Sequence, residues 1–89
     1  MIDVKMQTEL GKRLNKIAGQ INGIRRMIEN KKYCVDIINQ ITAVRRALES
    51  LGCEVMKNHI NTCIKEDIKR TGGEDKINEL METIHKFIK

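Results

Sequence analysis

The apolar residues of the first 55 positions recur at alternating steps of three and four. The first run consists of Leu10, Leu14, Ile17, Ile21, Ile24 and Ile28. The second run consists of Cys34, Ile37, Ile41, Val44, Leu48, Leu51 and Val55. This spacing places one apolar stripe along a helix that packs against another helix. Because the chain also lacks Pro and has only 2% aromatic residues, a β-sandwich or barrel is disfavoured and an all-α fold is predicted.

Three helices account for nearly the whole chain in this prediction. The first covers about residues 5–29 and ends at Asn30, a residue that tolerates left-handed backbone geometry. The second runs from about 33 to 70, and segment 71–73, which contains two glycines, separates it from a short third helix that begins at Glu74. The short connection after the first helix predicts an antiparallel hairpin of the two long helices. The chain is therefore expected to form a single three-helix domain over its 89 residues.

A chain of 89 residues has barely enough apolar surface for one self-sufficient core. The second helix, about 50 Å long at a rise of ~1.5 Å per residue, extends beyond the first helix and leaves part of its own stripe uncovered. We therefore predict a homodimer or homotetramer with twofold symmetry. The sequence contains neither an apolar leader segment nor an apolar run of the length that spans a bilayer, so a cytoplasmic protein without membrane contact is expected.

Positive charge is concentrated in the first half of the chain. Residues 1–46 hold ten Lys or Arg and four Asp or Glu residues, a net charge of +6, whereas residues 47–89 carry a net charge of −1. This charge makes nucleic acid, an anionic membrane surface or an acidic protein a plausible partner. Because only two aromatic residues are available to stack on unpaired bases, single-strand recognition is disfavoured, and the backbone of double-stranded DNA remains as the nucleic-acid target. The basic residues assigned to this contact are Lys12, Arg13 and Lys16 on the polar face of the first helix, and Arg45 and Arg46 on the second.

His59 and Cys63 are four residues apart on the second helix, so their side chains lie one turn apart on the same face and could share a metal ion. Cys34 precedes His59 by 25 residues. This is about 37 Å along a continuous helix at ~1.5 Å per residue, so the two cannot meet in one chain. In an antiparallel pair of second helices, Cys34 of one copy meets His59 and Cys63 of the other. The predicted site therefore combines two thiolates and one imidazole from two chains.

This ligand set favours Cu(I). Two soft thiolates with few further ligands suit Cu(I), whereas Zn(II) prefers a fourth ligand and Ni(II) prefers four ligands in a plane. Cys53 lies off the apolar stripe and is assigned no role, and His85 is interpreted as a surface residue. An enzyme with a cysteine nucleophile is disfavoured, because three helices of this composition supply neither an oxyanion hole nor a substrate cavity. No small-molecule substrate is therefore expected.

The same residues resemble a known family over nearly the whole chain. The residues that carry the resemblance are Arg13, Leu14, Ile17, Gly19, Gln20, Gly23, Ile24, Tyr33, Cys34, Asp36, Ile37, Gln40, Ala43, Val44, Arg45, His59 and Cys63. They look like the CsoR/RcnR/FrmR family of bacterial metal-responsive repressors, and the order of cysteine, histidine and cysteine resembles its copper-sensing CsoR branch. The resemblance implies a dimer of dimers whose apo form binds operator DNA. It also implies that Cu(I), bound between two chains, releases the DNA and derepresses copper-homeostasis genes.

The resemblance also implies roles for single residues. It implies that the three predicted ligands bind Cu(I), and that Tyr33 and Glu79 form hydrogen bonds with the ring of His59. Such bonds would orient the imidazole and select its tautomer. It further implies that Arg13 and Arg45 are among the residues that contact DNA.

Other branches of the family match this sequence less well. The nickel-sensing branch uses a histidine near the position of Ile2, and this chain has no histidine before His59. The persulfide-sensing branch keeps both cysteines but lacks the histidine, and the formaldehyde-sensing branch lacks the second cysteine. The alternative that stays open is a repressor of the same family that senses persulfides or electrophiles through Cys34 and Cys63, or that senses another transition metal.

Overall fold

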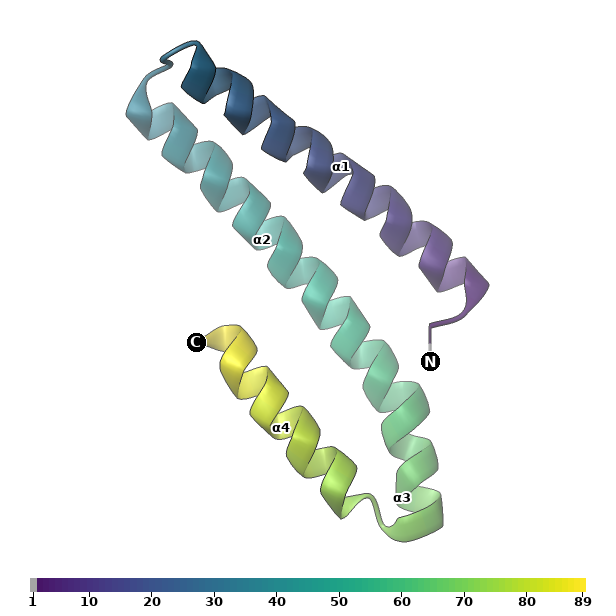
Figure 1. Ribbon diagram of the computed structural model, residues 1–89. Coiled ribbons are helices and arrows are strands. Elements are labelled where there is room, and N and C mark those ends of the chain that lie inside the picture. The colour runs from purple at the N-terminus through teal and green to yellow at the C-terminus, as the bar shows by residue number, and fades with distance from the viewer. Residues whose placement is uncertain (1) are drawn as a thin grey trace. The chain divides into compact units, whose positions relative to one another are not determined.

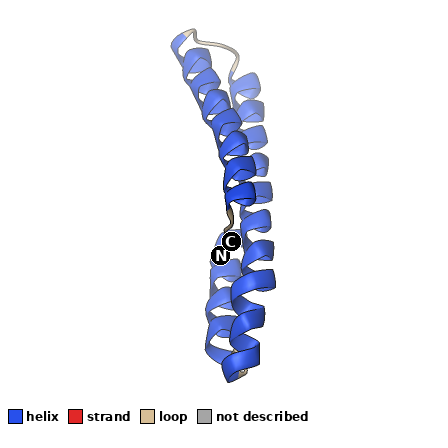
Figure 2. Cartoon of the chain, turned by 90° about the vertical axis from the view of Figure 1, so that its right-hand side faces the viewer, coloured by secondary structure: helices blue, strands red, loops and turns tan. Residues whose placement is uncertain are grey.

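The computed structural model describes residues 2–89, and helices make up almost all of that part (Figure 1). In chain order these are α1 (Val4–Glu29), α2 (Cys34–His59), a π-helical turn (Ile60–Ile64), α3 (Lys65–Thr71) and α4 (Glu74–Ile88). Figure 2, coloured by secondary structure, shows no strand in the described residues. The chain divides into two compact units, residues 2–55 and 56–89, which are described separately below. The predicted all-α fold is thus confirmed.

The first unit is an antiparallel hairpin of α1 and most of α2, as predicted. Asp3 begins α1 because its carboxylate accepts a hydrogen bond of 2.8 Å from the backbone N–H of Met6, which satisfies one of the free donors of the first turn. The buried contact between the helices is thin. Only Ile17 on α1 and Val44 on α2, which are 5% and 8% exposed, are buried in this unit.

The loop of the hairpin differs from the prediction in one detail. Asn30 does not adopt the left-handed conformation, with φ at −88°. The next residue, Lys31, does so instead, with φ at 52°. The backbone N–H groups of Lys31 and Lys32 donate to the carbonyls of Ile28 and Met27, which is the Schellman motif. That motif places the left-handed residue one position after the helix cap, which is why Lys31 rather than Asn30 takes it.

The apolar stripes of both helices are wider than the contact between them. The outer edge of α1 remains exposed at Leu14, Ile21 and Ile28, and that of α2 at Ile38, Ile41 and Leu48, with 43% to 59% of each residue accessible. Burying a side chain of this kind contributes roughly 1.5–3 kcal/mol. The hairpin therefore presents an apolar surface that a further helix would cover, which supports the predicted self-association.

The second unit contains the end of α2, the π-helical turn, α3 and α4. The second helix predicted from about 33 to 70 is confirmed in extent, but its hydrogen bonding changes from α-helical to π-helical at residues 60–64. There the backbone N–H of Lys65 donates to the carbonyl of Ile60, five residues earlier instead of four. Ile64, 4% exposed, is the buried large hydrophobic residue of this unit. None of the described helices combines the length and the apolar content that a membrane-spanning segment needs.

A tight turn of two glycines joins α3 to α4. Gly72 and Gly73 both have left-handed backbones, with φ at 87° and 74°. The backbone N–H of Gly72 donates to the carbonyl of Ile68, and that of Ile77 donates to the carbonyl of Gly73. A Cβ atom on Gly73 would lie 2.5 Å from Cγ1 of Ile68 and 3.2 Å from its Cα, whereas one on Gly72 would meet open space. Only glycine therefore allows α4 to approach α3 this closely.

Candidate metal centre

The two candidate ligands in the second unit lie on either side of the change in helix type. His59 is the last residue of α2, and Cys63 lies inside the π-helical turn. Both side chains are half-buried. Single π-helical turns inside longer helices occur frequently at functional sites, because they change the direction in which the following side chains point. The structure thus places an imidazole and a thiol one turn apart, at a local irregularity of the backbone.

The surroundings of Cys63 favour its thiolate form. The hydroxyl of Thr62 lies 3.6 Å from the Sγ atom of Cys63, and it also donates to the carbonyl of Asn58 at 2.8 Å. The Thr62 hydroxyl and, more weakly, the positive charge of Lys76 hold the pKa of the Cys63 thiol below its ordinary value. Because metals bind the thiolate rather than the thiol, a lowered pKa makes this side chain a better ligand near neutral pH.

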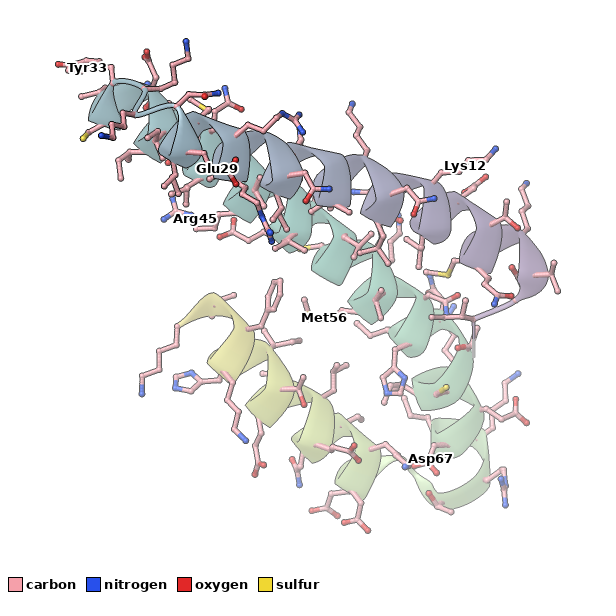
Figure 3. All side chains as sticks on the ribbon, turned by 45° about the horizontal axis from the view of Figure 1, so that its top comes forward. Lys12, Glu29, Tyr33, Arg45, Met56 and Asp67 are labelled. Atoms are coloured by element: carbon pink, nitrogen blue, oxygen red, sulfur yellow. The ribbon has the colours of Figure 1, made fainter. Side chains whose placement is uncertain are left out.

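The two residues expected beside the His59 ring lie on different elements. Glu79 is on α4, where its carboxylate lies 3.9 Å from the ammonium of Lys76, and the described residues contain no hydrogen bond between Glu79 and His59. Tyr33 is 70% exposed and immediately precedes α2 in the first unit, and Figure 3 shows its side chain at the loop end of the hairpin. Their predicted contacts with the ring stay predictions.

Cys34 begins α2 and His59 ends it, so these two ligands stand at opposite ends of one 26-residue helix. Cys34 is exposed, and it precedes Ile38 of the uncovered apolar surface by one turn. Within residues 2–89, no three His, Cys, Asp or Glu side chains are grouped closely enough to hold a metal ion. The described part of one chain thus has two candidate ligands at the end of α2 and in the π-helical turn after it, and the third at the start of α2.

The remaining cysteine and histidine are separate from these ligands. None of the three cysteines in residues 2–89 forms a disulfide, and Cys53 is exposed on the side of α2 away from the apolar stripe. His85 is exposed on α4, as the sequence predicts.

The five basic candidates are distributed over both helices of the hairpin. Lys12, Lys16, Arg45 and Arg46 are exposed, and Figure 3 shows Lys12 and Arg45 extending into solvent from α1 and α2. Arg45 lies 3.9 Å from the carboxylate of Glu49, one turn later on α2. Arg13 differs from the expected position on the polar face. Its side chain is half-buried, and its Nη2 atom donates a hydrogen bond of 2.8 Å to the hydroxyl of Ser50 on α2.

Two features of the site escape sequence reasoning. The first is the π-helical turn, for which the signal was weak. Thr62 in the middle of a helix donates to the carbonyl four residues earlier, a bond that often bends helices. The second is Ser50, which no motif marks and which becomes visible only when α1 and α2 are paired.

Comparison with known proteins places the chain in one family. Residues 6–86 match the family model described as metal-sensitive transcriptional repressor. The chain is 39% identical over 85 residues to the copper-sensing transcriptional repressor CsoR of Bacillus subtilis. The matched region covers 96% of this chain and 84% of that protein.

Solved structures agree with the sequence comparison. The crystal structure of CsoR with Cu(I) from Geobacillus thermodenitrificans superposes with a TM-score of 0.92 at 36% identity, covering 98% of this chain and 91% of that one. The nickel-responsive transcriptional regulator InrS is more distant, with a TM-score of 0.78 at 30% identity and 90% coverage of each chain. The match to the family model, together with these relatives, shows that the present chain belongs to the family of metal-sensitive transcriptional repressors, which are regulators and not enzymes.

Proposed function

We propose that this protein is a Cu(I)-responsive transcriptional repressor of the cytoplasm. Its apo form binds double-stranded operator DNA as a homodimer or homotetramer, and Cu(I) binding weakens that complex. Cys34 of one copy, with His59 and Cys63 of a second copy, would hold the metal ion. Tyr33 and Glu79 would then form hydrogen bonds with the His59 ring. The similar proteins whose names state copper sensing support this proposal.

The observation that carries the proposal is the division of the ligands along α2. His59 and Cys63 share one turn at the end of this helix, while Cys34 begins the helix and lies next to its uncovered apolar surface. Covering that surface with an antiparallel second copy supplies the missing thiolate. Two thiolates and an imidazole are a donor set that suits a soft ion such as Cu(I) better than Zn(II), which prefers a fourth ligand.

The proposed DNA contact depends on the charge of the hairpin. Lys12, Lys16 and Arg46 are exposed, and no carboxylate within residues 2–89 forms an ion pair with them. In a symmetric oligomer each of these charges is repeated, so the surface can neutralise several phosphates at once. The affinity should therefore fall steeply as salt rises.

The test is an anaerobic anisotropy titration of a labelled duplex taken from immediately upstream of the gene. Reduced apo protein is expected to bind this duplex, and one equivalent of Cu(I) per chain is expected to release it. One equivalent of Ni(II) or Zn(II) should leave the complex in place. Absence of specific binding by the apo protein would refute the repressor proposal, and binding that ignores Cu(I) would refute the choice of effector.

The site between two chains can be tested by complementation. A Cys34→Ser chain and a Cys63→Ser chain each lack one thiolate at every site, so neither variant alone should bind Cu(I) tightly. When the two are mixed and allowed to exchange, each mixed pair contains one intact site, formed by Cys34 of one chain and Cys63 of the other. Recovery of about half of the sites in those pairs is expected. No recovery after demonstrated exchange would refute the intersubunit arrangement.

A thiol sensor of the same family is the second candidate, because the lowered pKa of Cys63 also favours reaction with persulfides or electrophiles. The His59→Ala variant distinguishes the two functions. A thiol sensor would retain its response to persulfide without the imidazole, whereas the copper response should be lost or strongly weakened.

A further inference from the structure

Ser50 forms the only side-chain hydrogen bond that joins α1 to α2 within residues 2–89. Nη2 of Arg13 donates to the Ser50 hydroxyl at 2.8 Å, across 37 residues of sequence. The other side-chain hydrogen bonds of the described chain join residues no more than four positions apart. A bond that links the two helices directly therefore ends on one of the candidate DNA-contacting residues.

The acceptor of this bond, the Ser50 hydroxyl, is neutral, so the positive charge of Arg13 is not compensated. Arg45 lies against the carboxylate of Glu49, whereas no carboxylate pairs with Arg13 in the described residues. A guanidinium has five N–H donors, so the single bond to Ser50 leaves four of them for other acceptors. The hydroxyl restricts the position of the side chain without neutralising it.

Ser50 lies at the surface of the hairpin, near a second arginine. Ser50 is exposed while Arg13 is half-buried, so the bond lies at the surface of the hairpin. Arg46 lies one turn before Ser50 on the same side of α2 and has no carboxylate partner in residues 2–89. Two uncompensated arginines, one from each helix, thus belong to the surface around Ser50.

We propose that Ser50 is a positioning residue for DNA binding, which holds the Arg13 guanidinium ready to contact a phosphate group. This inference rests on the proposed function. A long flexible side chain that is already fixed loses less conformational entropy when DNA binds. Ser50 itself does not need to touch the DNA, and its effect passes entirely through Arg13.

The experiment is a double-mutant cycle on the apo protein. Anisotropy titrations with the operator duplex compare wild type, Ser50→Ala, Arg13→Gln and the double variant. Ser50→Ala should weaken binding by about two- to tenfold per Arg13 contact, the range for losing one pre-ordered side chain. In the Arg13→Gln background, the same change should have no effect. An equal loss in both backgrounds, no loss, or tighter binding by Ser50→Ala would each overturn the proposal.

The dependence on salt separates positioning from charge. Arg13→Gln should reduce the slope of log affinity against log salt by roughly one for each phosphate group that Arg13 neutralises in the wild type, whereas Ser50→Ala should leave that slope unchanged. Ser50→Thr keeps a hydroxyl and should restore most of the affinity. Thr42→Ala is the matched control, because the Thr42 hydroxyl donates to the carbonyl of Ile38 within α2 and forms no hydrogen bond with an arginine in residues 2–89.

Weaker DNA binding by Ser50→Ala is not expected to result from unfolding of the variant. Alanine favours helices more than serine does, so Ser50→Ala should not destabilise α2. The same titrations distinguish an error in the proposed role of Ser50 from an error in the proposed function of the protein. In the first case wild type binds the duplex and the Ser50 variant behaves like it, and in the second case wild type does not bind the duplex specifically.

Discussion

The substitution Gly73→Ala should destabilise the turn between α3 and α4 more than any other small change there. Two costs add at this position. A left-handed backbone costs a non-glycine residue about 1–2 kcal/mol, and Gly73 has φ of 74°. The new Cβ would also lie 2.5 Å from Cγ1 of Ile68 and 3.2 Å from its Cα. Overpacking of this kind costs about 1–3 kcal/mol, so the total is about 2–5 kcal/mol.

The neighbouring glycine separates these two costs. Gly72 has φ of 87°, but a Cβ there would have nothing within 4 Å. Gly72→Ala should therefore cost only the backbone strain of about 1–2 kcal/mol. The assay is urea unfolding of the apo protein, followed by circular dichroism at one fixed protein concentration, because dissociation of an oligomer contributes to the apparent stability. If Gly73→Ala costs no more than Gly72→Ala, the close approach of Ile68 does not constrain the turn and the reasoning is refuted.

Three further predictions concern the site and the charged surface. Thr62→Val should raise the pKa of the Cys63 thiol, so the midpoint of its alkylation by iodoacetamide, measured in a Cys34→Ser, Cys53→Ser background, moves to higher pH. Thr83→Val removes a similar hydroxyl on α4 and is the control, and an unchanged midpoint in Thr62→Val would contradict the assigned cause. Cys53→Ser should leave the Cu(I) affinity, measured by competition with a chromophoric chelator, within twofold of wild type, and a larger loss would assign Cys53 to the site. Lys12→Gln should lower the salt dependence of DNA binding more than Lys86→Gln, which removes an equal charge from α4, and equal effects would place the DNA elsewhere.

Helix positions were predictable because they depend on local periodicity. The steps of three and four in α1 and α2 reflect one apolar face of each helix. The glycines at 72 and 73 favour the end of a helix, and α3 ends there. The π-helical turn was not predictable in the same way. It depends on a single shift from four- to five-residue hydrogen bonding, and the only local sign is the hydroxyl of Thr62. A difference of one backbone bond leaves almost no pattern in the sequence.

The candidate ligands could be recognised from the sequence by residue type and spacing, whereas the groups that surround them could not. His59 and Cys63 are recognisable because a spacing of four is set by the helix itself. The charge of Lys76 that acts on Cys63 comes from α4, and the Ser50 acceptor for Arg13 comes from the opposite helix of the hairpin. Both interactions depend on how the helices pack against each other, and the spacing of residues along one helix does not predict that packing.

The width of the apolar stripes links the proposed metal site to the association of two chains. A hairpin needs only one narrow face on each helix, yet Leu14, Ile21 and Ile28 extend the stripe of α1 beyond that face, and Ile38, Ile41 and Leu48 do the same on α2. Leaving these side chains in water forgoes roughly 1.5–3 kcal/mol for each one that a partner could bury. Cys34 lies at the start of the same uncovered surface of α2. The free energy that would drive association and the thiolate that would complete the metal site thus come from one surface, so assembly of two chains and formation of the site should occur together.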